Sequence, residues 1–409
     1  MDTITHGIVG ALTAKAFFAG SASRPPAVPG GALRTDWAPA GRAAIVACTL
    51  GATFPDIDVF AGPIAGNPLA MLEWHRGLTH SVVALPLWAL LLAAMAGPLA
   101  RWMKWESPGF WGRATIFGAG IGTHILLDVV TNFGTMVWSP LDYRRVAWDW
   151  LFILDFTFTA IALVPQLAGW CYRDPESFRL RAAVTWMLLT LGAVGVYALA
   201  GRVGFGFSIW AVGVASAILA TVLFAPAVRG AGLLWSRAAW SRAGFALLCI
   251  YLGVAGLAHR TALETVEGYA ASRGIEAEKI AALPLPPNPT HWVGLMTTQE
   301  GVWRSLFRVP SGRPESATIY ASTRRDPYIE QARKLPDVQA YLRFAAFPVW
   351  RVERSADKTV VEITDVRFFR QQSQELQRPR RLSGGSFTFA VVFDAAGALV
   401  SHGFREPDP

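Results

Sequence analysis

The stretch Gly122-Thr-His-Ile-Leu-Leu-Asp-Val-Val-Thr131 decides the fold, because it places two metal-ligand side chains at the end of an apolar run. The run covers about residues 114–133, enough for a helix to cross the roughly 30 Å of hydrocarbon in a bilayer. His124 and Asp128 are four residues apart, so on a helix both point to one face and can bind one ion. The alternative is a polar pair that hydrogen-bonds a neighbouring helix. In either case the polar groups need partners, because they are costly at membrane depth.

The composition indicates an integral membrane protein. The 409 residues are 53% hydrophobic and 16% charged. We predict a mainly α protein, a polytopic transmembrane helical bundle of about eight spans, followed by a small β-rich soluble domain at the C-terminus. The predicted spans lie near residues 82–100, 114–133, 151–168, 182–200, 206–226 and 243–258, with weaker candidates at 4–20 and 43–58.

The net charge of +8 does not indicate a nucleic-acid partner, because Arg and Lys lie mainly in short connections between the apolar runs. If the helices alternate in direction, most of these cations fall on one side, which should be cytoplasmic. We therefore predict a multi-pass protein of a bacterial-type inner membrane. The helix ends that carry the candidate site, and the C-terminal domain, should then lie on the extracytoplasmic side.

The composition changes after about residue 258, where charged residues become frequent and apolar residues begin to alternate with polar ones. We predict three parts: a transmembrane metal-site domain (1–258), a helix with a Pro-rich connector (259–289) and a β-rich soluble domain (290–409). The connector contains Leu283-Pro-Leu-Pro-Pro-Asn-Pro289, which cannot continue a helix. Strands are predicted at 349–354, 359–366 and 387–393 from their alternation.

Pro55-Asp-Ile-Asp58 places two carboxylates two residues apart, immediately after an apolar run. An extended backbone would direct both the same way. Anions at a helix C-terminus oppose the helix dipole and need a cation nearby. The alternative interpretation is an ordinary turn, but its position after the run favours a site.

Trp74-His-Arg-Gly-Leu-Thr-His-Ser81 spaces His75 and His80 five residues apart, which does not place both on one helical face. A loop residue followed by a residue in a first helical turn fits better, with Gly77 permitting the turn. Structural histidines that hydrogen-bond the backbone are the alternative. Arg76 could bind a substrate anion, or hold Asp56 or Asp58.

Two further residues belong to the candidate set. His6, at the head of the first apolar run, counts as a ligand only together with the others. Asp155 lies near the start of a predicted span, so it needs a partner. It could be a ligand, a group that orients a ligating histidine, or the ion-pair partner of Arg144 or Arg145. The other three histidines lack such company and are assigned structural or surface roles.

The number of candidate ligands exceeds what one tetrahedral ion needs, and suggests two divalent ions. Nitrogen and oxygen ligands without thiolate fit zinc, manganese or iron, and ligand type alone does not choose among them. We take zinc as the expected ion, with manganese or iron as alternatives. A bound ion lowers the pKa of water towards about 7, so hydrolysis of an ester or phosphoester is the natural chemistry. The substrate would be a small molecule or a lipid of the surrounding bilayer. We assign catalytic roles to Asp56, Asp58 and Arg76. The predicted metal ligands are His6, Asp56, Asp58, His75, His80, His124 and Asp128, and Asp155 is the candidate orienting group.

Taken together, Met1-Asp-x-x-Thr-His-Gly7, Pro55-Asp-x-Asp58, His75-Arg-Gly-x-Thr-His-Ser81 and His124-x-x-x-Asp128 resemble a family of inner-membrane-associated, metal-dependent hydrolases. Some members of that family are described as LexA-binding. The resemblance covers about residues 1–160 and implies that the seven predicted ligands form the site. The family usually has Pro after the acid at Asp155, where this chain has Phe156.

Two other classes of function remain open. Histidines and carboxylates in a membrane also form ion or proton pathways, so a transporter is the first alternative. The second is a structural or regulatory membrane protein that a metal stabilises, with a β domain that binds a protein partner. A transporter needs a polar path across the bilayer, and a structural metal should be needed for folding.

Overall fold

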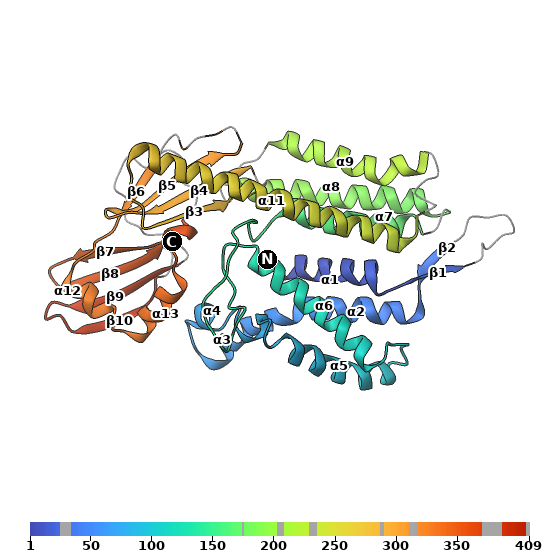
Figure 1. Cartoon of the computed structure of the whole chain (residues 1–409), viewed down its shortest axis with the longest axis horizontal. Coiled ribbons are helices and arrows are strands. Elements are labelled where there is room, and N and C mark those ends of the chain that lie inside the picture. Colours follow the sequence, from blue (N-terminus) through green and yellow to red (C-terminus); the bar gives the residue numbers. More distant parts are fainter. Residues whose placement is uncertain are drawn as a thin grey trace.

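The computed structural model describes residues 1–24, 34–173, 176–202, 208–228, 235–286, 290–310, 312, 314, 317–369 and 387–405. A bundle of antiparallel helices occupies one end of the molecule and a β domain the other (Figure 1). Each of the eight apolar runs contains a helix, as predicted. These helices are α1 (Thr3–Phe17), α2 (Pro39–Thr53), α5 (Leu85–Trp102), α6 (Phe110–Val129), α7 (Phe156–Cys171), α8 (Phe178–Arg202), α9 (Ile209–Val228) and α11 (Arg237–Arg273).

Four helical segments within the described ranges are long and apolar enough to cross a membrane. They are Ala40–Ala65, Leu85–Trp102, Phe178–Gly201 and Arg237–Arg273. Phe156–Cys171 and Ile209–Ala225 are shorter apolar helices. The mainly helical membrane fold is thus confirmed, whereas the total of about eight spans remains a prediction.

Helices α2 and α6 pack at backbone contact because glycines line their crossing. A Cβ atom on Gly120 would lie 2.4 Å from the carbonyl oxygen of Cys48, and one on Gly51 would lie 2.7 Å from that of Phe117. Small residues allow membrane helices to approach this closely. The close approach brings the end of α6, with its two polar residues, against the end of α2.

Short elements follow α2 and lead to α5. They are η1 (Phe54–Phe60), α3 (Ala61–Ala65), α4 (Ala70–Glu73) and η2 (Leu78–His80). Pro55 has no N–H to continue the α2 hydrogen-bond ladder, and the chain tightens there into a 3-10 helix. The Pro55–Asp58 segment is therefore helical, and the extended backbone that we predicted for the two carboxylates is wrong. Strands β1 (Ser21–Arg24) and β2 (Arg34–Trp37) form a small hairpin at the opposite end of the bundle.

Helix α11 is continuous across the composition change at residue 258. Its first half packs on α7 and α1, and its second half lies on the β domain, where Val266 and Ala270 join Trp292 in one core. Strand β3 (Lys279–Pro284) begins inside the predicted connector, so the sheet starts earlier than the predicted boundary at residue 290. Residues 287–289 of that connector lie outside the described part of the chain.

The β domain contains two four-stranded antiparallel sheets and two short helices, α12 (Pro327–Ala332) and α13 (Pro336–Phe344). The first sheet has the order β3-β4-β5-β6 and the second β10-β9-β8-β7. The three predicted strands are confirmed as β7, β8 and β9. The remaining bounds are β4 (His291–Thr297), β5 (Gly301–Arg308), β6 (Ala317–Ala321), β7 (Pro348–Arg354), β8 (Lys358–Asp365), η3 (Val366–Phe368), β9 (Thr388–Asp394) and β10 (Leu399–Phe404).

The β domain docks on the end of the bundle through an apolar core. Phe133, from the loop after α6, packs on Phe344 of α13 with ring centroids 5.0 Å apart. Leu69 and Leu72 of the α3–α4 region join the same core. Arg367 donates to the carbonyl oxygen of Asn132 at 3.0 Å, which adds a polar link. The loops at this end of the bundle are therefore held between the helices and the sheets.

Candidate metal centre

The predicted ligands come together at the end of the bundle that faces the β domain. His6 lies in the second turn of α1, Asp56 and Asp58 lie in η1 after α2, His80 ends η2, and Asp128 lies in the last turn of α6. Because α2 and α6 both run opposite to α1, the start of α1 and the ends of α2 and α6 meet (Figure 1). The side chains of His6, His80, His124 and Asp128 are fully buried.

Four ligand atoms have the spacing of a tetrahedral ion site. The Nε2 atoms of His80 and His124 are 2.9 Å apart. Asp56 Oδ1 lies 3.5 Å from both nitrogens, and Asp128 Oδ2 lies 3.3 Å and 3.5 Å from them. Bonds of about 2.0–2.2 Å in a tetrahedron imply edges of about 3.3–3.5 Å. Four of these five distances match that value, and the residues present fit a divalent ion.

The hydrogen bonds around His124 leave its Nε2 free to coordinate. Nδ1 lies 2.6 Å from the carbonyl oxygen of Ala52, so it carries the proton and donates it. Pro55 has no N–H for this carbonyl in the 3-10 turn, so the oxygen is available to the histidine. Metal-ligating histidines commonly donate their second nitrogen to a carbonyl or carboxylate in this way.

His80 is oriented by a carboxylate on its other face. Its Nδ1 lies 3.2 Å from Asp58 Oδ2, which leaves Nε2 directed at the other three ligands. Burial lowers the pKa of His80, but hydrogen bonds with Asp128, Asp56 and Asp58 outweigh it and raise the pKa to about 10. The three carboxylates thus create a negative potential that favours a cation between them. A divalent ion bound there would take the place of a proton on these ligands.

Asp58 and His75 form a second cluster with His80 that could also hold an ion. His75 Nδ1 lies 2.7 Å from Asp58 Oδ1. The other oxygen of Asp58 accepts from the Arg76 backbone N–H at 3.0 Å and from the Thr79 hydroxyl at 2.9 Å. With His80, Asp58 therefore has four donors, about as many as a carboxylate accepts. This arrangement favours an orienting role for Asp58 and a single ion in the first cluster.

Arg76 holds Asp128 rather than facing outward. Its side chain is 4% exposed, and its Nε lies 2.9 Å from Asp128 Oδ2. That contact is an ion pair rather than a hydrogen bond, because the N–H does not point at the oxygen. Nη1 donates to Thr131 Oγ1 at 3.0 Å. Of the two interpretations from the sequence, the contacts favour an internal ion pair, with Asp128 as the partner in place of Asp56 or Asp58.

His6 lies beside the four-ligand cluster. Its ring stacks on His124 with a centroid distance of 3.6 Å, and its Nε2 lies 3.2 Å from Asp128 Oδ1. The amino group of Met1 contacts the same oxygen. His6 Nδ1 and Asp128 Oδ2 are buried without a hydrogen bond, which marks both as atoms able to accept an ion.

The contacts described for Asp155 are with α7 and α11, and its predicted role as an orienting group remains a prediction. Its Oδ1 caps α7 by accepting from Phe158 N at 2.9 Å, and its Oδ2 accepts from the Tyr251 hydroxyl at 2.7 Å. Arg144 pairs instead with Asp142, and Arg145 donates to backbone carbonyl oxygens, including that of His75. Asp155 therefore links α7 to α11.

Several groups that position the ligands were not predicted from the sequence. Thr3 donates to Asp56 Oδ2, and Thr79 donates to Asp58, so each carboxylate has a threonine partner. The Ala52 carbonyl and the glycines of the α2–α6 crossing also position the ligands. Thr79 stands beside His80 in the sequence and could have been suspected. The contacts made by backbone atoms cannot be predicted from residue type, apart from those at the glycines.

Two segments of the chain match known protein families. Residues 1–202 match the YdjM inner membrane protein family. Residues 327–375 match the YfhP C-terminal alpha/beta plait domain, in agreement with the helices and strands found there. The chain matches no curated protein and no solved structure.

Proposed function

Because residues 1–202 match the YdjM inner membrane protein family, we propose that this membrane protein is a metal-dependent hydrolase. The reaction would be the hydrolysis of an ester or a phosphoester. The hydroxyl of a water molecule would join the acyl carbon or the phosphorus, and the ester oxygen would leave with the remaining proton.

The convergence of His80, His124, Asp56 and Asp128 carries this proposal. Two imidazole nitrogens with fixed second hydrogen bonds face two carboxylate oxygens at distances that suit one ion. The donor set contains nitrogen and oxygen without thiolate, which fits zinc and also manganese or iron. A divalent ion held there would supply a hydroxide nucleophile at neutral pH and would polarise the ester oxygen.

The residues of the site have separable tasks in this mechanism. Asp56 is the most exposed of the four ligands, at 12% of its side chain, so it stands nearest to an arriving substrate and can accept a proton from water. Asp58 fixes the ring of His80. Arg76 neutralises Asp128 and offsets the negative charge that develops as the ester bond breaks.

The two alternatives predict different behaviour. A transporter needs polar groups across the bilayer, whereas the seven predicted ligands lie within contact of one another in one cluster. A purely structural metal would be required for folding. Removing the ion with a chelator should leave the hydrolase folded, because the α2–α6 glycine contact and the interdomain core do not depend on it.

The direct test is a substrate screen with full-length, detergent-purified protein loaded with zinc or manganese. Carboxylic esters, phosphomonoesters and phosphodiesters that release a chromophore would be compared for the wild type, Asp56→Asn and Asp142→Asn. We expect metal-dependent turnover of at least one class, lost in Asp56→Asn and retained in Asp142→Asn, whose aspartate pairs with Arg144 at the surface. No turnover by folded, metal-loaded wild type across all three classes would reject the hydrolase.

We also propose that the site and the β domain lie on the extracytoplasmic side. Basic residues at the opposite end of the bundle support this orientation: Arg101 ends α5, Arg113 lies in the first turn of α6 and Arg237 begins α11. A cysteine introduced at position 402 should react with a membrane-impermeant label in intact cells, and one at position 24 should not. The reverse pattern would overturn this orientation.

A further inference from the structure

The short elements that carry Asp56 and Asp58 show only apolar side chains to the outside. From Phe54 to Leu72 the sequence has three hydrogen-bonding side chains. Asp56 and Asp58 turn inward to the histidines, and Asn67 bonds Glu73 at 3.1 Å. The outward side chains of this α3–α4 face include Ile57, Phe60, Ile64 and Met71, which are 56%, 63%, 85% and 45% exposed.

The other turns of the site repeat this pattern. Ile4, which follows the Asp56 partner Thr3, is 75% exposed. Trp74 precedes His75 and is 41% exposed, and Leu78 precedes Thr79 and is 48% exposed. In the two histidine turns the polar side chain points to the cluster and an adjacent large apolar side chain points away from it, whereas Thr3 is exposed as well as bonded to Asp56. An opening to bulk water would be expected to have a polar rim.

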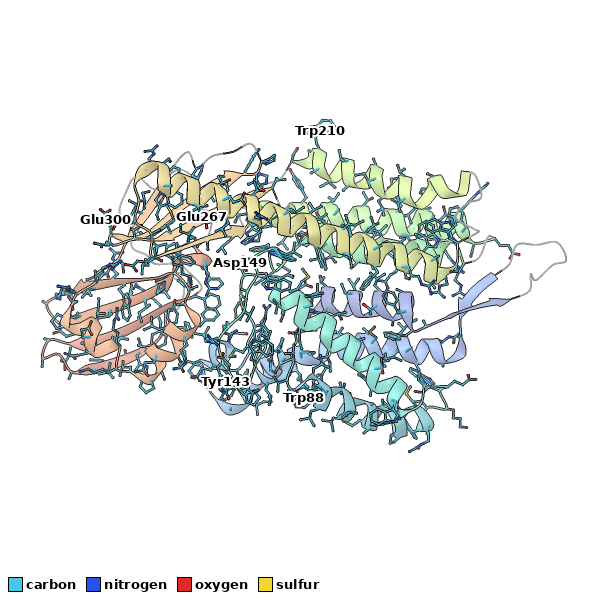
Figure 2. All side chains as sticks on the ribbon, in the orientation of Figure 1. Trp88, Tyr143, Asp149, Trp210, Glu267 and Glu300 are labelled. Atoms are coloured by element: carbon cyan, nitrogen blue, oxygen red, sulfur yellow. The ribbon has the colours of Figure 1, made fainter. Side chains whose placement is uncertain are left out.

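The bilayer is the natural cover for this surface. The apolar segment Ala40–Ala65 runs without a break from α2 through η1 to α3, so the α3–α4 face continues a candidate membrane span. Its 26 residues exceed the roughly 20 that cross the hydrocarbon, and its last turns should therefore reach the membrane interface. Trp138 and Tyr143, 52% and 63% exposed, belong to the loop after α6; Figure 2 shows Tyr143 at this end of the bundle. Trp and Tyr are typical of that interface.

The partly exposed members of the site lie within these apolar turns. The side chains of Asp56, Asp58 and His75 are 12%, 9% and 13% exposed, whereas those of His80, His124 and Asp128 are fully buried. Asp56 and Asp58 flank Ile57, and His75 follows Trp74. A substrate that reaches the ligands past these residues must cross an apolar rim.

We propose that the site opens towards the lipid interface and accepts an ester or phosphoester of a membrane-borne amphiphile. The acyl chain of the substrate lies along the α3–α4 face, and the polar linkage reaches Asp56 and His75. This inference rests on the proposed hydrolase for its chemistry. The lipid exposure of the α3–α4 face can nevertheless be measured without catalysis.

The first experiment measures where the α3–α4 face lies. An environment-sensitive fluorophore is attached to Ile64→Cys in full-length protein reconstituted in phosphatidylcholine–phosphatidylglycerol vesicles. A Cys249→Ser background removes the exposed native cysteine. The control is Ile319→Cys, on β6, where the native isoleucine is 52% exposed. We expect doxyl-labelled lipids to quench the label at position 64 at least several-fold more than the label at 319, and aqueous iodide to do the opposite. Equal iodide quenching at the two positions would overturn the proposal.

The second experiment tests whether the α3–α4 face binds the acyl chain, separately from whether the metal centre hydrolyses the ester. Two substrates with the same scissile linkage are compared, one water-soluble with a short chain and one with a long acyl chain presented in vesicles. Ile64→Glu should lower turnover of the long-chain substrate at least tenfold and leave the short-chain rate within twofold. Equal loss on both substrates would contradict the acyl-chain path. Lipid quenching at position 64 without any turnover would retain the membrane-facing surface and reject the hydrolase. Turnover with an aqueous position 64 would do the reverse.

Discussion

The contact between α2 and α6 and the contact between α8 and α9 are two ways of pairing apolar helices. In the first, Gly51 and Gly120 bring the backbones together, and His124 lies buried beside the crossing. In the second, Gly195 and Gly213 would leave a Cβ atom in open space. Large residues of α8 and α9 face outward. In this bundle the imidazole and carboxylate groups lie where the backbones touch, because there other protein groups can satisfy them, whereas the α8–α9 contact holds hydroxyl and indole groups.

The largest expected effect comes from filling the α2–α6 contact. Gly120→Val places a side chain where even a Cβ atom would meet the Cys48 carbonyl oxygen, and should lower the free energy of unfolding by more than about 3 kcal/mol or prevent folding. Gly195→Val adds the same β-branched residue to α8, where nothing lies within 4 Å. Thermal unfolding of both detergent-purified variants would show the difference. Equal melting temperatures of the two variants would contradict the inferred difference between the α2–α6 and α8–α9 contacts.

A second prediction concerns how the stability of the protein depends on pH. Helix α9 contains no titratable side chain, whereas the end of the bundle that carries the candidate metal centre contains several, so pH should act on that end. Asp149 lies between the bundle and the β domain (Figure 2). Burial raises its pKa to about 6, although Arg367 and Lys279 oppose the rise. The unfolded value is near 3.9. The folded state therefore binds the proton more tightly, and the stability from this group is full below about pH 4 and is lost as the pH rises to about 6.

The Asp149→Asn variant tests that sign. The free energy of unfolding that the wild type loses through Asp149 as the pH rises is at most about 3 kcal/mol, at 1.36 kcal/mol for each unit of pKa. The variant should melt higher than the wild type at pH 7 and equally at pH 4. Asp142→Asn, with the carboxylate paired to Arg144 at the surface, is the control and should show no such gain. A variant that is less stable than the wild type at pH 7 would refute the assignment.

The smallest expected effect is at the α8–α9 contact. Ser216 Oγ lies 2.9 Å from Thr190 Oγ1 and accepts from Trp186 Nε1 at 3.1 Å. Hydrogen bonds between membrane helices contribute about 0.6 kcal/mol on average, so Ser216→Ala should lower the melting temperature only slightly. Thr221→Ala is the matched control, because among the described residues that hydroxyl donates to the Ala217 carbonyl of its own helix. A loss above about 2 kcal/mol would mean that this contact also holds the fold.

The sequence was sufficient to predict the elements whose signal is local. The spacing of His124 and Asp128 predicted one helical face, and the length of the apolar runs predicted the helices. The alternation in 387–393 likewise predicted β9. These features depend on periodicity and length, which a single sequence displays directly.

The remaining features depend on partners far away in the chain. Asp56 and Asp58 contact opposite nitrogens of His80 because η1 is a 3-10 helix that packs beside η2. No local sequence pattern predicts that contact. Asp155 was predicted as a support for the site because its burial is costly, but its partner is Tyr251, almost a hundred residues away. Helix α11 continues past residue 258 because the β domain covers its polar half.

The measurement that tests the central claim most directly is the metal content of full-length, detergent-purified protein. Wild type would be compared with the double variant His124→Ala, Asp128→Ala and with His259→Ala, which lies on α11 away from the cluster, after a folding check on each. We expect about one zinc, manganese or iron ion per chain in the wild type and in His259→Ala, and none in the folded double variant. A wild type that binds no divalent ion even after reconstitution, or a double variant that retains the ion, would contradict it.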